Sequence, residues 1–422
     1  MEIATDDNRA AEKTAVISIN KKELMAVMEP CKRIAVQRNY TPILSNVLFV
    51  AKDSSTICAI ATDTDTSVRG IVGCSIDGVG VDVGDVSFAV PGGRFYDCLK
   101  SMPDGLLVIR LDGNAVVLSS DKTPVQHNVT RVEAQEFPAL PEPDGRLEGF
   151  TMPASSLAWL IKRTAYAIGD ESRGYKLDCA KLVGCGGTLR MYGADRHRFV
   201  NAAVRVESLR GSMSMLIPES SVLTLSTLVK GGAGKRKTRD PLVVVERTYS
   251  HVFFTIDNIR LTARLMDGKY LEVEKGLKEF RVSHVVRVKD RKDFLGVLRS
   301  MRVTMAAKAD TWDKRKKPTY WVDMEPCGSH LKVSTVSSEG AESSATVEAD
   351  CEEVVDADAV DRNDVPTIVR VNTDYMLEAM KSFDDVKSLV MRLGDVQPIQ
   401  IECENEIEGR SCLTLVMPIG RD

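Results

Sequence analysis

One local pattern occurs six times along this chain, and it limits the folds that the chain can adopt. Three copies start at Ile17, Phe150 and Val285, and each reads as a short strand, a polar turn and an amphipathic helix. Three further copies alternate with these along the chain, at residues 86–103, 213–230 and 367–384. Each copy leads into segments that alternate apolar and polar residues, with Gly, Asp or Asn at the turns, which is typical of hairpins. Short helices at such wide intervals favour an α+β fold with antiparallel sheets and helices on one side of them.

The six copies group in pairs, so we expect three similar tandem domains, each with two strand–helix–strands units. Such domains would have about 130–150 residues, an ordinary domain size. The expected bounds are a flexible N-terminal tail at 1–13 and domains at 14–143, 147–277 and 281–422. Linkers are expected near 138–149 and 274–283. Residues 339–364 are acidic and partly of low complexity, which favours an outer strand plus a flexible insertion in the third domain.

The bulk composition excludes some function classes and leaves others open. The 422 residues are 43% hydrophobic and 27% charged, as in globular proteins, and the net charge is −4. This total does not point to nucleic acid, although a local basic face would suffice for such binding. The polar first residues do not resemble a signal peptide, and no apolar run is long enough to span a bilayer, so we expect a cytoplasmic protein. The ten cysteines form no C-x-x-C pair and no zinc-like spacing with histidine, so we expect no metal and no cofactor.

The helices share a second regularity, which concerns their charges. Four of them carry an apolar stripe at i, i+3, i+4 and i+7, starting at Phe95, Leu157, Phe294 and Met376. Position i+5, about 150° from the stripe centre, is basic in all four: Lys100, Lys162, Arg299 and Lys381. The other two helices carry Lys32–Arg33 and Lys230 near their ends. Such residues can simply complement the helix dipole, but their recurrence in an acidic protein favours a shared surface that contacts the phosphates of a polyanion.

Residues 191–204, MYGADRHRFVNAAV, place four polar residues between two apolar runs, and His197 is one of only five histidines. A metal site would need a second ligand at i+4 or a pair of cysteines, and neither is present. A general base would need an orienting carboxylate and a nucleophile. Asp195 is close in sequence, but neighbouring side chains on a hairpin point apart. Two other interpretations are a turn histidine that is satisfied by the backbone, and the border of a docking surface.

Six segments, in order and at family-like spacing from about Thr14, resemble the bacterial DNA polymerase III β subunit, the β sliding clamp. They are RNYTPILSNVLFVA, ATDTD, VPGGRFYDCLK, GADRHRF, LMDGKYLEVEKGL and LTLVMPIGRD. The resemblance implies a head-to-tail dimeric ring of three-domain protomers, with helices around a central hole and sheets outside. It implies a non-catalytic protein that encircles duplex DNA without sequence specificity. Such a ring confers processivity by tethering the polymerase III α subunit, the clamp loader and other proteins with clamp-binding motifs.

The resemblance also implies a groove between the second and third domains that binds short peptides with Leu and Phe anchors. Carried over by position, its residues are Leu177, His197, Arg198, Phe199, Leu271, Tyr375, Val396, Pro398, Val416, Met417, Pro418 and Ile419. The chain departs from the family at Ala194, Arg196 and Leu271, where Thr, Gly and Pro are usual. We therefore expect a shifted peptide preference.

Two further sets of residues complete the expected sites. The helix positions, the resemblance and the basic loops together give a DNA-contact set of Arg38, Lys100, Lys162, Arg173, Tyr175, Lys230, Lys235, Arg236, Lys237, Arg299, Lys314, Arg315 and Lys381. The family pairs an edge strand of the first domain with one of the third. The candidates for that interface are Leu107 and Ile109 in LLVIRL, and the helix around Phe294 and Leu298.

Three functions of different classes compete on this sequence. The first is a non-enzymatic processivity factor that encircles DNA. The second is a nucleic-acid enzyme that holds Mg²⁺ on Asp63, Asp65 and Asp195, although these acids are expected at equivalent hairpin ends of different domains, far apart. The third is a repeat adaptor for replication proteins that forms no ring, needs no basic helix face and stays a monomer.

Overall fold

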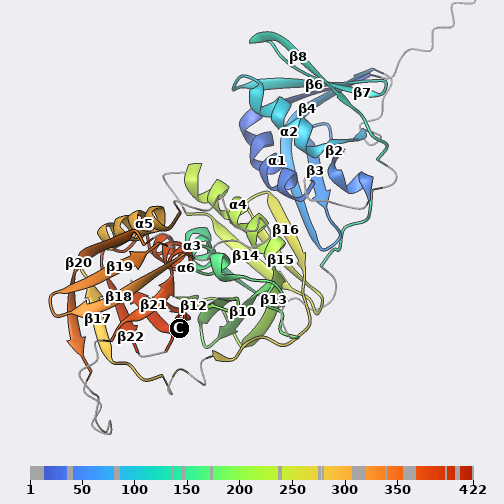
Figure 1. The fold of residues 1–422 in the computed structure, drawn as a ribbon. Helices are drawn as coiled ribbons and strands as arrows, with labels where there is room; N and C mark the ends of the chain where they lie inside the picture. Colours follow the sequence, from blue (N-terminus) through green and yellow to red (C-terminus); the bar gives the residue numbers. More distant parts are fainter. Residues whose placement is uncertain are drawn as a thin grey trace, which may run out of the picture. The chain divides into compact units, whose positions relative to one another are not determined.

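The structure is a computed structural model, and its helices and strands are drawn in Figure 1. It describes residues 14–35, 41–79, 86–134, 137–143, 148–171, 174–235, 240–273, 277, 280–306, 320–337, 340–354, 367–394, 397–403 and 409–420. The chain forms two compact units, residues 1–157 with 220–265, and residues 158–219 with 266–422. Helices α3 (Ala154–Thr164) and α4 (Glu219–Lys235) each run from one unit into the other.

The first unit contains a 12-stranded sheet. Its main path runs β8-β7-β6-β1-β4-β16-β15-β14-β9, while β3 pairs with β4 and β2 pairs with β3 and β5. The bounds are β1 (Thr14–Asn20), β2 (Asn46–Asp53), β3 (Thr56–Thr62), β4 (Thr66–Val79), β5 (Ser87–Pro91), β6 (Leu106–Asp112), β7 (Ala115–Ser120), β8 (Thr123–Thr130), β9 (Glu148–Pro153), β14 (Leu242–Arg247), β15 (His251–Ile256) and β16 (Ile259–Arg264).

The second unit contains another 12-stranded sheet, in the order β13-β10-β11-β12-β24-β23-β22-β17-β20-β19-β18-β21. All strand pairings in both sheets are antiparallel over the described residues, as the hairpin pattern predicts. The bounds are β10 (Cys179–Cys185), β11 (Thr188–Ala194), β12 (Arg198–Arg205), β13 (Ser212–Pro218), β17 (His284–Val288), β18 (Trp321–Cys327), β19 (His330–Val336), β20 (Glu342–Glu353), β21 (Val369–Asn372), β22 (Leu389–Leu393), β23 (Ile399–Cys403) and β24 (Arg410–Val416).

The six predicted helices are confirmed. Besides α3 and α4 they are α1 (Lys21–Ala35), α2 (Gly92–Ser101), α5 (Arg291–Ala306) and α6 (Thr373–Ser382), and two 3₁₀ turns, η1 (Pro42–Ser45) and η3 (Ala165–Ala167), accompany them. Figure 1 shows α1 beside α2 and α5 beside α6, and each pair covers strands of its own unit. The residues that start the four predicted stripes, Phe95, Leu157, Phe294 and Met376, are at most 2% exposed, so these stripes face the core.

The division into three domains stays a prediction. The two sheets do not separate the predicted domains, because strands of neighbouring domains pair with each other. β4 of the first predicted domain pairs with β16 of the second, and β12 of the second pairs with β24 of the third. Part of the expectation for the acidic segment is confirmed, because β20 covers Glu342–Glu353. Residues 1–13 and 355–366 lie outside the described ranges.

The expectation of an open strand edge at LLVIRL is wrong. These residues form β6, whose backbone is paired on both sides, with β1 and with β7. The strand at that end of the sheet is β8. The four residues proposed for the interface, Leu107, Ile109, Phe294 and Leu298, are at most 1% exposed and belong to the core of their own chain. A charge at Ile109 would therefore disrupt folding rather than separate protomers.

The cysteines and the helices add two simple findings. The ten cysteines are free, and four of them, Cys31, Cys58, Cys179 and Cys412, are buried. Burial raises the pKa of the Cys412 thiol to about 12, which makes it a poor nucleophile at neutral pH. Within the part of the chain that the structure describes, no helix combines the length and apolar character needed to cross a membrane.

A buried arginine fastens α3 to the segment that follows α6. The side chain of Arg163 is 1% exposed, and its Nη2 lies 2.5 Å from a carboxylate oxygen of Asp385. Its other terminal nitrogen donates to the carbonyl oxygen of Ser382. The guanidinium also lies 4.3 Å from the ring centroid of Phe383, and the Trp159 indole donates to the same Asp385 carboxylate at 2.9 Å. A buried cation with this set of partners holds the helix in one register.

We predict that Arg163→Ala lowers the stability of the second unit by about 3 kcal/mol, because it leaves the Asp385 carboxylate without its buried partner. The matched control is the neighbouring Lys162→Ala, which removes an exposed ion pair to Asp384 and should cost less than about 1 kcal/mol. Thermal unfolding followed by circular dichroism compares the two variants. Equal unfolding midpoints would contradict the prediction.

Candidate functional site

The stretch around His197 is a tight turn between β11 and β12, and Asp195 organises it. One oxygen of its carboxylate accepts the backbone N–H groups of His197 at 2.7 Å and Arg198 at 2.6 Å. The other accepts the Arg198 guanidinium from Nε at 2.9 Å and Nη2 at 2.8 Å. This local side-chain to backbone bonding is typical of Asp in turns. The carboxylate is thus engaged by Arg198 and the backbone, and the interpretation of Asp195 as an orienting partner for the His197 imidazole gains no support.

Arg198 is the centre of a half-buried charge cluster. Its side chain is 8% exposed and also pairs with Glu378 of α6. Burial by itself would lower the pKa of Arg198, but the carboxylates of Asp195 and Glu378 outweigh it and raise the pKa above its usual value. Its guanidinium lies 4.4 Å from the ring centroid of Tyr375 and 5.5 Å from that of Tyr166. Arg198 therefore joins the turn to α6 at all working pH values.

His197 itself is exposed, and its ring stacks on Tyr375 with the centroids 5.4 Å apart and 24° between the planes. Its backbone carbonyl oxygen accepts the N–H of Met417 at 2.8 Å. Further along, the N–H of Ile419 donates to the carbonyl oxygen of Arg370 at 2.8 Å. The end of the chain thus lies between the turn and β21, and the sequence-predicted residues His197, Tyr375 and Met417 are brought together.

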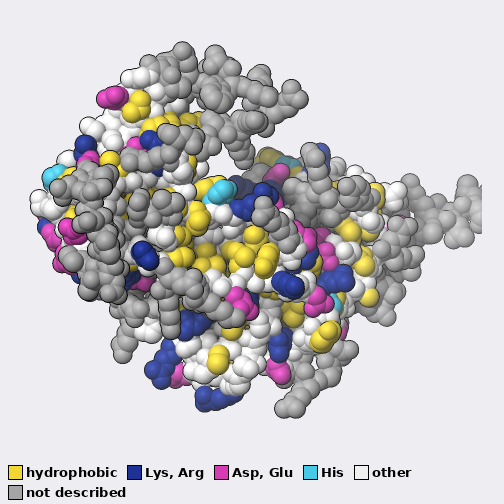
Figure 2. Space-filling model, turned by 60° about the horizontal axis from the view of Figure 1, so that its bottom comes forward, with side chains coloured by type: hydrophobic (Ala, Val, Ile, Leu, Met, Phe, Trp, Pro, Cys, Tyr) yellow, Lys and Arg dark blue, Asp and Glu magenta, His cyan; other side chains and the backbone are white. Residues whose placement is uncertain are grey.

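The other face of β12 carries an apolar cluster, which we call the Phe199 cluster. Its buried members are Leu177, Cys179, Tyr192, Ala194, Phe199, Leu216, Tyr270 and Leu415. Part of its cover comes from the connection after β16, through residues that include Met266, Leu271 and Phe280. The rings of Tyr192 and Phe199 lie 5.9 Å apart. Figure 2 shows hydrophobic side chains at the surface in this view, with both basic and acidic side chains around them.

The structure places the predicted groove residues in two groups. Leu177, Phe199 and Leu271 belong to the Phe199 cluster, while His197, Arg198 and Tyr375 lie on the other side of β12 with the α6 contacts. At the chain end Val416 is buried, Met417 is 44% exposed, and Pro418 and Ile419 are half-buried. Pro398 is buried next to the start of β23. Val396 lies outside the described residues.

Sequence reasoning missed Leu415 and Tyr270 as members of the cluster. The signal for Leu415 is present in the alternation of LTLVMP, because Leu413, Leu415 and Met417 fall on one strand face. The pairing of Phe199 with Leu415 identifies it as the face of the cluster. No comparable pattern marks Tyr270, whose hydroxyl donates to the carbonyl oxygen of Tyr192 at 3.3 Å. Burial raises the pKa of Tyr270, so it stays neutral.

Of the helix positions that were expected to meet a polyanion, Lys100, Lys230, Arg299 and Lys381 are exposed. Lys162 is exposed too, but it pairs with Asp384. Tyr175 is 38% exposed. The remaining members of the DNA-contact set, Arg38, Arg173, Arg236, Lys237, Lys314 and Arg315, lie outside the described residues, as does the side chain of Lys235.

The acids of the proposed Mg²⁺ site serve as turn residues. The Asp63 carboxylate accepts the backbone N–H groups of Asp65 at 3.1 Å and Thr66 at 2.6 Å. The Asp195 carboxylate is engaged by Arg198, as described above. Over the residues that the structure describes, no group of three or more His, Cys, Asp or Glu side chains is arranged to hold a metal ion. In the part of the chain that the structure describes, Asp63 and Asp195 are therefore held in separate turns and do not form the proposed Mg²⁺ site.

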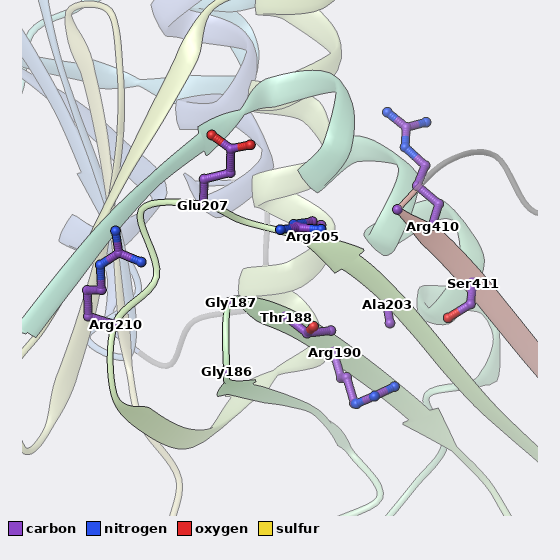
Figure 3. Close-up of a pocket in the computed structure, with 11 residues that line it drawn as sticks. Gly186, Gly187, Thr188, Arg190, Ala203, Arg205, Glu207, Arg210, Arg410 and Ser411 are labelled. Carbon is purple, nitrogen blue, oxygen red and sulfur yellow. The ribbon is translucent and has the colours of Figure 1, made fainter.

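A polar pocket of about 740 Å³ lies elsewhere, at the opposite ends of β11 and β12 from the His197 turn (Figure 3). We call it the arginine basin, and sequence reasoning missed it. It is lined by Gly186, Gly187, Thr188, Arg190, Ala203, Arg205, Glu207, Arg210, Gly409, Arg410 and Ser411. Its four arginines are scattered over 221 positions of the sequence. The pairing of β11 with β12 brings Arg190 and Arg205 together, and Arg210 follows β12. Arg410 lies opposite Val204 at the rim, with its guanidinium 5.6 Å from the ring centroid of Trp159 in α3.

Two family profiles match this chain. "DNA polymerase III beta subunit, N-terminal domain" matches residues 15–141, and "DNA polymerase III beta subunit, central domain" matches residues 151–272. Among individual relatives, the beta sliding clamp of Pseudomonas aeruginosa is 25% identical over 262 residues, which cover 62% of this chain and 67% of the relative. That of Haemophilus influenzae is 22% identical over 266 residues, with the same coverage of 62% and 67%.

Solved structures match the fold over nearly the whole chain. The DNA polymerase III beta subunit of Thermotoga maritima has a TM-score of 0.79 at 20% identity, covering 97% of this chain and all of its own. The sliding clamp of Bacillus subtilis has a TM-score of 0.78 at 18% identity, with the same coverage. A Pseudomonas aeruginosa clamp bound to griselimycin has a TM-score of 0.77 at 19% identity over 96% of this chain.

We predict that Asp195→Ala loosens the His197 turn. The amides of His197 and Arg198 lose their acceptor, and their hydrogen exchange should speed up by about tenfold or more. Asp195→Asn keeps an oxygen acceptor without the charge, and its effect should be smaller. Native-state exchange read by mass spectrometry or NMR measures both variants, with the amides of β15 as an internal reference. Unchanged exchange in Asp195→Ala would show that the carboxylate does not hold the turn.

Proposed function

This chain belongs to the family of the DNA polymerase III beta subunit, the beta sliding clamps, and we propose that two copies of it close into a ring around duplex DNA. A topological link needs no tight contact, so the ring can slide while it keeps a bound polymerase near the primer end. The role is non-catalytic, as family membership implies. The protein is a processivity factor of the replicative polymerase, and we assign it to the cytoplasm, where a bacterial chromosome is copied.

The observation that carries the ring proposal is a strand pairing that occurs twice within the chain. β16 is the last strand of the β14–β15–β16 meander, and it pairs with the first half of β4, Thr66–Gly70. β24 is the last strand of the β22–β23–β24 meander, and it pairs with β12 in the same antiparallel sense. Each meander therefore adds its last strand to the sheet of the preceding repeat.

Among the described strands, two edges lack the neighbour that this arrangement would give them. One edge belongs to the last strand of a meander, and the other belongs to a strand that could receive it. β8 is the last strand of the β6–β7–β8 meander, and it pairs with β7 alone. β20 corresponds to β4, and its second half pairs with β17 as the second half of β4 pairs with β1. Its first half, Glu342–Glu348, pairs with β19 on one side only. Pairing of β8 with this half of β20 in a second copy repeats the internal arrangement and closes a head-to-tail ring.

The charge of the helices supports the placement of DNA inside such a ring. Lys100, Lys230, Arg299 and Lys381 are exposed on helices whose other faces are buried. Exposed Lys and Arg attract phosphates through contacts that salt screens and that do not read the sequence. Weak contacts of this kind suit a ring that must slide. The exposed Lys162, paired with Asp384, contributes less.

The Phe199 cluster and the chain end support the placement of the peptide groove. Leu177, Phe199 and Leu271 provide apolar walls, and Met417 is the large apolar side chain that remains exposed beside them in sequence register. A methionine adapts its shape to different anchors. We infer that partners such as the polymerase α subunit and the clamp loader insert Leu and Phe side chains here. Leu271 and Arg196 set the preference of this particular groove.

We predict that Val125→Asp on β8 yields a folded monomer of 46.4 kDa, whereas the parent protein has twice that mass. Val125 is 47% exposed, so the charge does not enter the core, but it would meet Glu342–Glu348 of the second copy, a strand segment that carries two glutamates. Leu242→Asp on β14 is the matched control, since Leu242 is 51% exposed and lies away from both open strands. Light scattering gives the masses.

The functional readout is retention on DNA. The parent protein and Leu242→Asp should stay on nicked circular DNA and leave once it is linearised, while Val125→Asp should be retained on neither. A Val125→Asp protein that remains dimeric would place the interface elsewhere. A parent protein that is monomeric at micromolar concentration would favour the adaptor without a ring.

We predict that Met417→Asp weakens binding of a peptide with Leu and Phe anchors by at least about tenfold, because it puts a charge into an apolar contact. The side chain is 44% exposed, so folding and dimer formation should persist. Isothermal titration calorimetry with this peptide measures the effect, and Leu242→Asp again serves as the control. An unchanged affinity for the peptide would show that the chain end does not line the groove.

A further inference from the structure

We propose that the arginine basin is a second docking site, which binds a carboxylate-rich peptide segment of a partner that is anchored at the Phe199 cluster. The inference rests on the proposed function in one respect, namely that a partner peptide occupies that cluster. The basin itself is argued from its own charges, its position and its shape.

The first argument is the lack of counter-charges. Six arginines of the second unit lie within 4.0 Å of a carboxylate: Arg163, Arg198, Arg287, Arg302, Arg370 and Arg392. Within the described ranges, no carboxylate lies that close to Arg190, Arg205 or Arg210, which are all exposed. Glu207 lines the same pocket without forming an ion pair with them. Arginines that line one pocket without a carboxylate partner leave a positive field there that an anion can neutralise.

The second argument is the register of the strands. Phe199, Asn201, Ala203 and Arg205 alternate along β12 and therefore share one face of the sheet. Their partners across the strand pair, on the same face of β11, are Ala194, Tyr192, Arg190 and Thr188 in that order. Each pair forms one row across the two strands. The face thus changes from the apolar Phe199 row to the basic Arg205 row over six residues, which span about 20 Å. A partner anchored at the cluster would reach the basin with a connecting segment that spans about 20 Å.

The third argument is the side of the sheet on which the basin opens. Leu189 and Met191 point to the opposite face and are buried. Gly193 lies on that opposite face too, and a Cβ there would collide with the carbonyl oxygen of Thr164 at the end of α3. The basin therefore opens away from the helices, which are proposed to face duplex DNA. This position favours a protein partner over the encircled duplex as the source of the anion.

The fourth argument is the shape and chemistry of the lining. Two turns border the basin with glycines at positive φ, Gly187 at 76° and Gly409 at 78°. A Cβ on Gly409 would lie 3.3 Å from the Cβ of Arg205, so the glycine leaves that side chain its room. The hydroxyls of Thr188 and Ser411 add donors beside the arginines. Arginine forks bind carboxylates in a bidentate manner, and a volume of about 740 Å³ accommodates several acidic side chains.

The primary experiment measures anisotropy of a fluorescein-labelled hexaglutamate peptide at low salt, where exposed charges are least screened. The test variant carries Arg190→Ala, Arg205→Ala and Arg210→Ala. The matched control carries Lys52→Ala, Arg110→Ala and Lys387→Ala, which change the net charge equally at exposed positions outside the basin and outside the proposed DNA-contact set. We expect the test variant to bind hexaglutamate at least about tenfold more weakly than the parent, and the control to bind it like the parent.

A second probe separates the basin from the groove. A peptide with Leu and Phe anchors is joined to hexaglutamate by a flexible linker of about 12 residues, which spans about 20 Å. The acidic tail should raise the affinity of the parent at least about tenfold over the anchor peptide alone and should add nothing in the test variant. Met417→Asp should lose the anchor peptide yet bind hexaglutamate unchanged, so the groove can fail without the basin failing.

Two results would overturn the proposal. Equal hexaglutamate affinity of the parent and the test variant would show that the arginines do not form an acidic-peptide site. Tighter binding of a hexathymidine oligonucleotide than of hexaglutamate, lost only in the test variant, would assign the basin to single-stranded nucleic acid instead.

Discussion

The pairing of a meander's last strand with the sheet of the preceding repeat is the interaction on which the rest of this structure depends. It occurs where β16 meets β4 and where β24 meets β12. Main-chain hydrogen bonds form this joint, so it demands little of the side chains, and it agrees with a shared fold at 18–20% identity. Exposed strand edges usually invite aggregation. The ring that we propose would cover the two edges that the joint leaves open among the described strands, β8 and the first half of β20.

The joint also fixes which side chains can meet. Because β12 and β24 are paired, Phe199 lies opposite Leu415, and Arg198 lies opposite Val416. Side chains alternate along β12, so its two faces differ. One face holds the Phe199 cluster and the arginine basin, and the other holds Arg198 with Tyr375 and Glu378. Asp195 anchors the turn between the strands and so keeps both faces in register.

The sequence predicted the six helices, their buried stripes and the antiparallel α+β class, because these depend on local periodicity. It misplaced the open edge, since LLVIRL has the alternation of any half-buried strand and nothing in it reports that β1 and β7 pair on both sides. In the site, His197, Phe199 and Met417 follow from motifs. The arginine basin does not, because Arg190 and Arg205 become neighbours only through the pairing of β11 with β12, and Ser411 joins them only through the pairing of β12 with β24.

The role of each charged residue also depends on its surroundings in the fold. A net charge of −4 says little about the individual cations, since the same residue type takes three different roles in this chain. Arg163 is buried against Asp385 and holds a helix, and Arg198 is shared between two carboxylates and holds a turn. Lys381 stands exposed on a helix. A cation that already has a carboxylate partner has little attraction left for a ligand, because its field is largely cancelled at close range. The cations available to bind anions are therefore the exposed ones on the helices and Arg190, Arg205 and Arg210 of the basin, which opens on the face of the second-unit sheet that α3 does not cover.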